Sequence, residues 1–261
     1  MNQPTLPNQD FSAYESWARF SAAARVRVHD AMARMQAERI RVCRAMESGQ
    51  QVSARVLGRG SQEINRNMAA EALNWRDLES IRSSGTIEQL AVSLPNNAVL
   101  VEAGLRMTSV WHYHGLDPDV RLALTAEDPA SYFFGYAPVQ MKIAGGDEVL
   151  LDGPIIRGEH TVIAVRDAAC VRAARGYWDA VRATIYPCAE EDLPFDELTE
   201  RQRRVVALML TCSSDEQIAR RLGTSVRTVR TEVATVLALL DAPTRFVAGV
   251  RLRERMSGMP A

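Results

Sequence analysis

The sequence lacks the features of a membrane or secreted protein. It contains no run of eighteen apolar residues that could span a bilayer and no secretory signal segment. Its cysteines are widely scattered and form no C-x-x-C pair, at Cys43, Cys170, Cys188 and Cys212. These absences predict a cytoplasmic protein with reduced thiols.

Lysine and histidine are also scarce. Lys142 is the only lysine among the 31 basic residues, a bias typical of a GC-rich genome, so arginine richness alone indicates little about function. Of the four histidines only His112 and His114 lie close together. On a strand they would share one face and could bind a metal, but no third ligand is near, which favours a structural or surface role. We therefore expect neither a metal nor a cofactor.

The chain is long enough for two domains. A small DNA-binding module needs far fewer than 261 residues, and a hydrophobic content of 47% is enough for a real core. The net charge of -1 conceals an asymmetry, because residues 195–261 carry eleven arginines against eight acidic residues and the remainder sums to about -4. The basic end is therefore the candidate for nucleic-acid binding.

Short helical patterns with clear start signals follow Leu198. Thr199 with Gln202, and Ser214 with Gln217, have the spacing of capping boxes. Leu222-Gly223-Thr224 predicts a short turn, after which Ser225 is placed to cap a third helix. Two helices joined by such a turn are typical of a helix-turn-helix, with the third helix of the series as its recognition helix.

Arginines cluster where a helix in the major groove would need them. Arg220, Arg221, Arg227 and Arg230 fall within twelve residues that contain no acid, and Thr228 and Thr231 offer hydroxyls. The alternative interpretation is a solvated cationic face on an ordinary helical domain. We predict contacts to double-stranded DNA from Arg221, Ser225, Arg227, Thr228, Arg230, Thr231 and Arg245.

This region resembles the LuxR-type helix-turn-helix of bacterial transcription regulators. The resemblance covers about sixty residues and rests on Leu198-Thr199, Glu216-x-Ile218-Ala219-x-x-Leu222, Ser225-x-x-Thr228-Val229-Arg230 and Leu240-Asp241-Ala242-Pro243-Thr244-Arg245. It implies a four-helix DNA-binding domain over 196–256 whose fourth helix, after Pro243, takes part in dimerisation. Three residues depart from the pattern. Gln202 replaces a common Glu, Cys212 a common Gly and Glu232 a common His, and Glu232 is expected to place an acid near phosphate.

The N-terminal segment predicts one long helix over 11–47. No glycine or proline interrupts Phe11 to Met46, and apolar residues recur every three to five positions. Such a helix would extend about 50 Å, which favours self-association as a coiled coil. The alternative is a helix folded back on its own domain or broken into a hairpin.

Strand and helix patterns alternate from 52 to 186, which predicts an α/β domain. Gly145-Gly146-Asp147 predicts a hairpin turn, and the acidic segment 187–195 is the predicted linker. The expected strands are 52–57, 107–113, 139–143, 148–152 and 161–165, and the expected helices are 61–80, 95–106 and 167–185.

The middle region is similar to the phospholipase D-like sensor domain of actinobacterial LuxR-type regulators, related to the effector domain of TrmB-like repressors. The resemblance rests on the Leu94-Pro95-Asn96-Asn97 helix, the Gly104-Leu105-Arg106-Met107 strand and the Tyr177-Trp178 helix. In the family the motif H-x-K-x-x-x-x-D supplies the catalytic histidine. Here Gln140 stands in that position, before Lys142 and Asp147, and no second motif copy is present. The resemblance therefore implies a domain that has lost catalysis.

Lys142 and the preceding aromatic residues are a candidate ligand pocket for a small-molecule effector. One cation among rings favours an anionic or aromatic ligand, and we predict a lining of Tyr132, Phe134, Tyr136, Lys142 and Asp147. The alternative is that these aromatics belong to the core or to a dimer interface.

The sequence as a whole predicts a homodimeric transcription regulator and not an enzyme. Its fold is an α/β regulatory domain with a long N-terminal helix, followed by an all-α, four-helix LuxR-type domain. Three other classes stay open: a phosphodiester hydrolase with an accessory nucleic-acid module, a phosphorylated response regulator and a protein-interaction adaptor. The missing nucleophile opposes the first, and the absence of an early strand ending in an acidic pair opposes the second.

Overall fold

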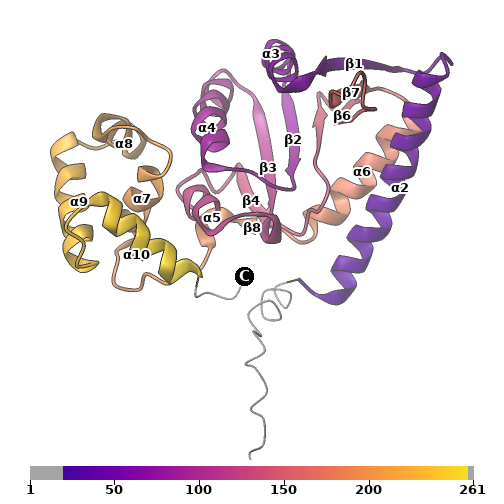
Figure 1. Cartoon of the computed structure of the whole chain (residues 1–261). Coiled ribbons are helices and arrows are strands. Elements are labelled where there is room, and N and C mark those ends of the chain that lie inside the picture. The colour runs from indigo at the N-terminus through magenta and orange to yellow at the C-terminus, as the bar shows by residue number, and fades with distance from the viewer. Residues whose placement is uncertain (1–19, 258–261) are drawn as a thin grey trace, which may run out of the picture.

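The computed structural model describes residues 20–257, which form an α/β part and a smaller helical part (Figure 1). The α/β part contains one eight-stranded sheet with the order β1-β7-β6-β5-β2-β3-β4-β8. Its central strands β2, β3 and β4 are parallel, and the other neighbours are antiparallel. The strands are β1 (Ala54–Arg59), β2 (Asp77–Arg82), β3 (Arg106–His112), β4 (Tyr132–Gly135), β5 (Met141–Ala144), β6 (Glu148–Asp152), β7 (Thr161–Val165) and β8 (Tyr186–Pro187).

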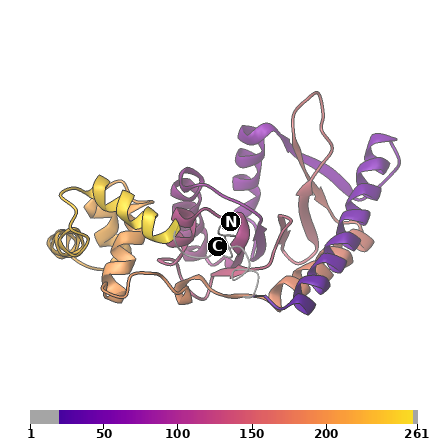
Figure 2. The same ribbon diagram turned by 60° about the horizontal axis from the view of Figure 1, so that its bottom comes forward.

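Helices cover both faces of this sheet. Helices α2 (Ala22–Glu47) and α6 (Ala168–Arg182) lie side by side on one face, as both views show (Figures 1 and 2). Helices α3 (Gly60–Ala72) and α4 (Ile87–Glu102) lie on the other. The short α5 (Pro118–Leu124) connects β3 to β4 and contacts both α4 and the helical part. Because helices flank it on both sides, most residues of the inner strands of the sheet are buried.

Several predicted elements match the structure closely. Strands β6 and β7 have the predicted bounds, and the turn between β5 and β6 contains Gly145 and Gly146, both with positive φ. Asp167 caps α6 by accepting a hydrogen bond from the Cys170 backbone N–H. These hairpin and cap signals are local, so the sequence alone was enough to place them.

Other elements were predicted wrongly. The helix expected over 61–80 ends at Ala72, and the rest of that range enters β2, where buried Leu78 and Ile81 pair with neighbouring strands. The helix expected from Pro95 begins eight residues earlier, because Thr86 and Gln89 form a capping box. Helix α5 and strand β4 were not predicted. A short apolar run carries no periodicity that separates strand from helix, and only tertiary pairing decides between them.

The long N-terminal helix was also predicted wrongly in its start and its packing. Helix α2 begins at Ala22, where Ser21 caps it by accepting from the Ala24 N–H; residues 11–19 lie outside the described part of the chain. Its apolar stripe, which includes Val28 and Met35, is buried against α6 rather than left open for a coiled coil. Folding back on the chain's own domain, the alternative interpretation, describes α2.

The predicted linker 187–195 is packed. Pro187 belongs to β8, residues 188–190 form a 3₁₀ turn, η2 (Cys188–Glu190), and Phe195 is fully buried among the C-terminal helices. The carboxylate of Glu191 accepts hydrogen bonds from the hydroxyls of Tyr113 and Tyr186 at 3.0 and 2.8 Å. The connection between the two parts is therefore fixed to the α/β part through Glu191 and to the helical part through Phe195. Over the described range, no helix is long and apolar enough to cross a membrane.

Candidate nucleic-acid interface

Four helices form the C-terminal part: α7 (Glu200–Met209), α8 (Asp215–Leu222), α9 (Val226–Leu239) and α10 (Arg245–Ser257). Their core contains Val205, Ile218, Val229 and Leu252. Leu122 of α5 and the nearby Ala126 belong to the same apolar cluster. The helical part therefore packs onto α5 of the α/β part (Figure 2).

The caps set the start of each helix. The first predicted capping box is confirmed, because Thr199 and Gln202 satisfy each other's backbone N–H groups. The second is formed only in part: Ser214 caps the Gln217 N–H, but the Gln217 side chain accepts from the backbone N–H of Ser213 instead of Ser214. Gly223 ends α8 in the left-handed conformation at φ 60°, which glycine adopts without a Cβ penalty. This turn places α9 across α8.

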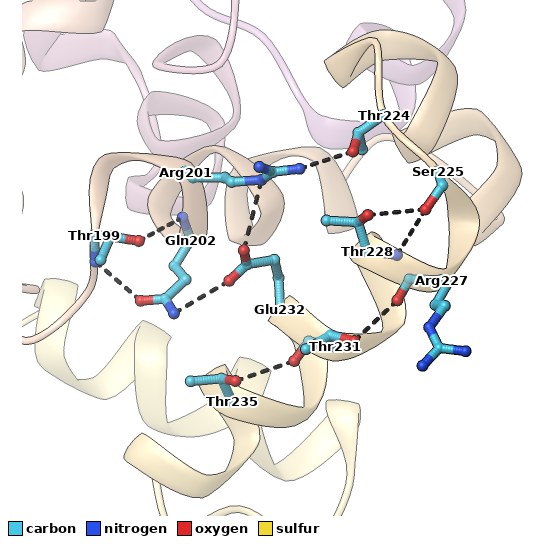
Figure 3. A network of polar contacts seen from close by, with 10 residues as sticks. All are labelled: Thr199, Arg201, Gln202, Thr224, Ser225, Arg227, Thr228, Thr231, Glu232 and Thr235. Carbon is cyan, nitrogen blue, oxygen red and sulfur yellow. Dashed lines mark hydrogen bonds and ion pairs between the residues drawn. The ribbon is translucent and has the colours of Figure 1, made fainter.

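The outward face of α9 carries the predicted DNA-contacting residues. Arg227, Arg230 and Thr231 are exposed, while Val229 and Val233 on the opposite side are buried. All three predicted hydroxyls make contacts within the helix itself. Ser225 Oγ accepts from the Thr228 N–H at 3.1 Å and lies 2.8 Å from Thr228 Oγ1. Thr231 Oγ1 donates to the carbonyl of Arg227 (Figure 3). The two arginines are thus the strongest candidates for base contacts.

These arginines differ in their partners. Arg227 points away from the polar network in Figure 3 and makes no ion pair with any described residue. The Arg230 Nε atom lies 3.3 Å from the carboxylate of Asp215, which also holds Arg245 at 2.7 Å. Hydrogen bonding from Arg245, followed by that from Arg230, lowers the pKa of Asp215. Asp215 therefore keeps Arg230 and Arg245 on one side of the domain.

Arg221 does not lie on the predicted DNA surface. Its guanidinium binds both carboxylate oxygens of Glu127, in the turn between α5 and β4, at 2.6 and 2.7 Å. The Glu127 side chain is only 5% exposed, against 30% for Arg221. Burial raises the pKa of Glu127, and the Arg221 charge opposes that rise. The prediction that Arg221 contacts DNA is contradicted, because a buried carboxylate of the α/β part holds it; the sequence carried no signal for this long-range pair.

Glu232 also points away from the predicted DNA surface. Its carboxylate accepts a hydrogen bond from Gln202 Nε2 at 3.2 Å and lies 3.5 Å from Arg201 Nε (Figure 3). These internal contacts do not favour the expectation that Glu232 places an acid near phosphate. Gln202 and Glu232 are two of the three departures from the LuxR-type pattern, and they contact each other. They form one internal link between α7 and α9.

One family model matches a part of the chain. Residues 195–240 match the model for Sigma-70, region 4, a range that spans α7, α8 and α9 and ends before α10. Neither the curated proteins nor the solved structures give a match. Together with the observed helices, this match indicates a helix-turn-helix DNA-binding domain and a role in transcription regulation.

The predicted ligand pocket is not formed as expected. Strands β2 and β3 lie between Lys142 on β5 and the aromatics of β4, so the two groups do not meet directly. Tyr136 lies beyond the end of β4, where its hydroxyl contacts His29 of α2 at 2.7 Å. Phe134 packs edge-to-face with Tyr113, and Asp147 is 68% exposed beside Arg166. Only Tyr132 and Lys142 of the five share a possible site.

Those two side chains belong to a polar row across one sheet face. Lys142 pairs with Ser80, Ser80 with Ser109, and Ser109 with Tyr132 on successive strands. Lys142 Nζ donates to Ser80 Oγ at 3.0 Å. Arg82, two residues after Ser80 on β2, is stacked on the Trp111 ring. Burial first, then the Arg82 charge, lowers the pKa of Lys142 to about 7. Ser80 and Arg82 were missed, although two polar residues within an apolar strand pattern were a usable signal.

Replacing Lys142 with methionine should stabilise the fold at low pH. Because its folded pKa lies below the usual value of about 10.4, the cost of burying the ammonium group is fully present below about pH 7. This cost is lost as pH rises from about 7 to about 10. We expect a gain of a few kcal/mol near pH 6 that shrinks towards pH 10, measured by urea unfolding. An equal gain at both pH values would contradict the buried charge.

The histidine pair is part of an aromatic cluster. His112 Nδ1 accepts from the Ala137 N–H at 3.0 Å, and its ring packs against Tyr136 and His114. Burial lowers the pKa of His112. Among the described residues no group of three His, Cys, Asp or Glu side chains is placed to hold a metal.

Proposed function

We propose that this protein is a sequence-specific, dimeric transcription regulator whose reader is of the LuxR type. The observation that carries this proposal is the outward face of α9, where Arg227, Arg230 and Thr231 are exposed beside the cap at Ser225. A recognition helix reads base edges in the major groove with side chains of this kind. The match to Sigma-70, region 4 supports the general class, and the fourth helix α10 supports the LuxR type.

Selection of bound duplexes from a random DNA library tests this function. The full chain should enrich one motif, and enrichment should weaken as salt rises because phosphate contacts release counterions. The variant is Arg227→Ala, and the control is Arg172→Ala, which replaces an exposed arginine on α6. Each removes one positive charge, so the two proteins have equal net charge. Loss of the motif only in the first variant supports α9 as the reader. Recovery of no motif by the wild type refutes sequence-specific binding.

We propose that dimerisation uses α10. Val250 on this helix is an apolar side chain that is 43% exposed. Two-fold symmetric readers match the two half-sites of an operator, so an apolar face on the reader is expected to bind its own copy. The stripe of α2 is already buried within the chain and is not part of this proposal.

Light scattering should report a dimer at micromolar concentration that Val250→Glu dissociates. A charge buried in the interface would lose its water without gaining a partner. Val92→Glu is the matched control, because Val92 on α4 is 66% exposed and far from α10 in the chain. A monomeric wild type, or equal loss of dimer in both variants, would contradict an α10 interface.

We propose that the phospholipase D-like α/β part is a non-catalytic sensor. Gln140, at the nucleophile position of the family, donates a hydrogen bond to Asp152 at 3.1 Å, and an amide cannot form a phosphohistidine. Lys142 and Arg82 have no carboxylate partner among the described residues, which supports binding of an anionic effector beside Tyr132. A thermal-shift screen with anionic metabolites tests this part, since hits should depend on Lys142 and change operator affinity.

A further inference from the structure

A cavity of about 240 Å³ lies where the helical part meets the α/β part, and we call it the junction cavity. Helix α5 contributes Asp119 and Leu122. The helical part contributes the remaining walls from α7, the turn after it and α10, namely Val206, Met209, Leu210, Cys212, Arg245, Phe246, Gly249 and Leu252. Any molecule bound there would contact both parts of the protein at once.

The lining of the junction cavity is mostly apolar and rich in polarisable groups. Met209 and Cys212 supply sulfur atoms and Phe246 supplies a ring, which are favourable contacts for an aromatic ligand. Arg245 is already bound to Asp215 at 2.7 Å. Asp119 is only loosely held by Arg253 at 3.8 Å, so its carboxylate can accept a further hydrogen bond. The cavity thus suits an aromatic body with one donor.

Two residues of α10 that line the junction cavity, Phe246 and Gly249, leave part of it unfilled. Phe246 remains 80% exposed although it lines the cavity. Gly249 lies inside the helix, where glycine costs about 1 kcal/mol relative to alanine. A Cβ added there meets nothing within 4 Å, so neither sterics nor backbone conformation requires glycine. The missing side chain leaves the space that a ligand would occupy.

We propose that the junction cavity binds a flat aromatic molecule of one or two rings that donates one hydrogen bond to Asp119. An apolar cavity of about 150 Å³ is enough for benzene, so 240 Å³ admits a larger ring system. The bound molecule covers the exposed Phe246 ring and joins α5 to α10. Its chemistry differs from that of the anionic effector proposed for Lys142, and its binding does not depend on the proposed DNA function.

The site lies beside the ion pair that joins the two parts. Cys212 lines the cavity and is close enough to Arg221 and Glu127 to be influenced by both charges. A ligand there favours the docked arrangement by its differential affinity for that arrangement.

Titration of the full chain with 1-naphthol tests the proposal, because its fluorescence responds to burial and its hydroxyl can donate to Asp119. The wild type is expected to bind saturably. Gly249→Leu should weaken binding at least tenfold while leaving the melting temperature unchanged or higher, since the new side chain fills the cavity. Gly176→Leu on α6 is the matched control, since a Cβ at that exposed helical glycine also meets nothing within 4 Å.

Phe246→Ala provides a second test that does not depend on filling the cavity. The side chain is largely exposed, so its loss leaves the core intact and is expected to weaken 1-naphthol binding severalfold. Absence of saturable binding to the wild type would overturn the proposal. So would equal affinity of the wild type, Gly249→Leu and Phe246→Ala, which would place the bound molecule elsewhere.

Discussion

Replacing Arg227 with alanine is expected to weaken operator binding by about 1–3 kcal/mol, or about 5- to 150-fold. Arg227 is exposed at the start of α9 and makes no ion pair with a described residue, so its guanidinium is available to DNA without breaking an internal contact. Arg230→Ala should have a smaller effect, because Arg230 must first leave Asp215. Titration with the selected operator, at two salt concentrations, measures both losses.

The salt dependence separates the two kinds of contact. A lost phosphate contact reduces the slope of log K against log salt by about one, whereas a lost base contact relaxes sequence preference and leaves the slope nearly unchanged. Arg172→Ala removes the same charge from α6 and serves as the control. Unchanged operator affinity in folded Arg227→Ala and Arg230→Ala would show that another element reads the DNA.

Replacing Arg221 with alanine is expected to destabilise the docked protein by up to about 3 kcal/mol. Removing one partner of a buried ion pair typically costs about 3–5 kcal/mol because the other charge stays buried. The lower end applies here, since Arg221 keeps 30% of its side chain exposed while Glu127 keeps 5%. Urea unfolding of the full chain measures the loss. Arg220→Ala, a neighbouring exposed arginine with no buried partner, is the matched control.

The loss should depend on pH with a defined sign. Burial already raises the pKa of Glu127, and removal of Arg221 raises it further. A carboxyl group with a raised folded pKa contributes stability below its unfolded value near 4.3 and loses it as pH rises through the folded value. Arg221→Ala should therefore be most destabilising near pH 8 and least near pH 4.5. The double variant Arg221→Met with Glu127→Leu should recover stability at pH 8. A loss independent of pH would rule out an uncompensated Glu127.

The second of these predictions concerns a contact that no local pattern indicates. Arg221 belongs to an arginine cluster of the kind that suits DNA, and sequence reasoning placed it there with Arg227 and Arg230. Its partner Glu127 is 94 residues away in the chain. Local spacing predicts which helix an arginine lies on, but the direction of a long side chain depends on which opposite charge the fold brings close.

Within the helix-turn-helix, too, local patterns were predictable from the sequence and long-range contacts were not. Thr199, Ser225 and Gly223 determine helix starts and a stop by contacts within four residues, so the sequence alone located α7, α8 and α9 well. The pairing of Gln202 with Glu232 required α7 and α9 to pack. Each residue looked like an isolated departure until the structure showed them 3.2 Å apart.

By itself the sequence determined the class of the C-terminal domain, the alternating α/β character of the rest and strands β6 and β7, because caps, turns and periodicity are local properties. Only the tertiary structure decided that α2 packs on α6, that β2 and β3 separate Lys142 from the β4 aromatics, and that α5 enters the core of the helical part. Strand order and helix docking depend on which apolar faces meet, and that is a property of the whole chain that no short window contains.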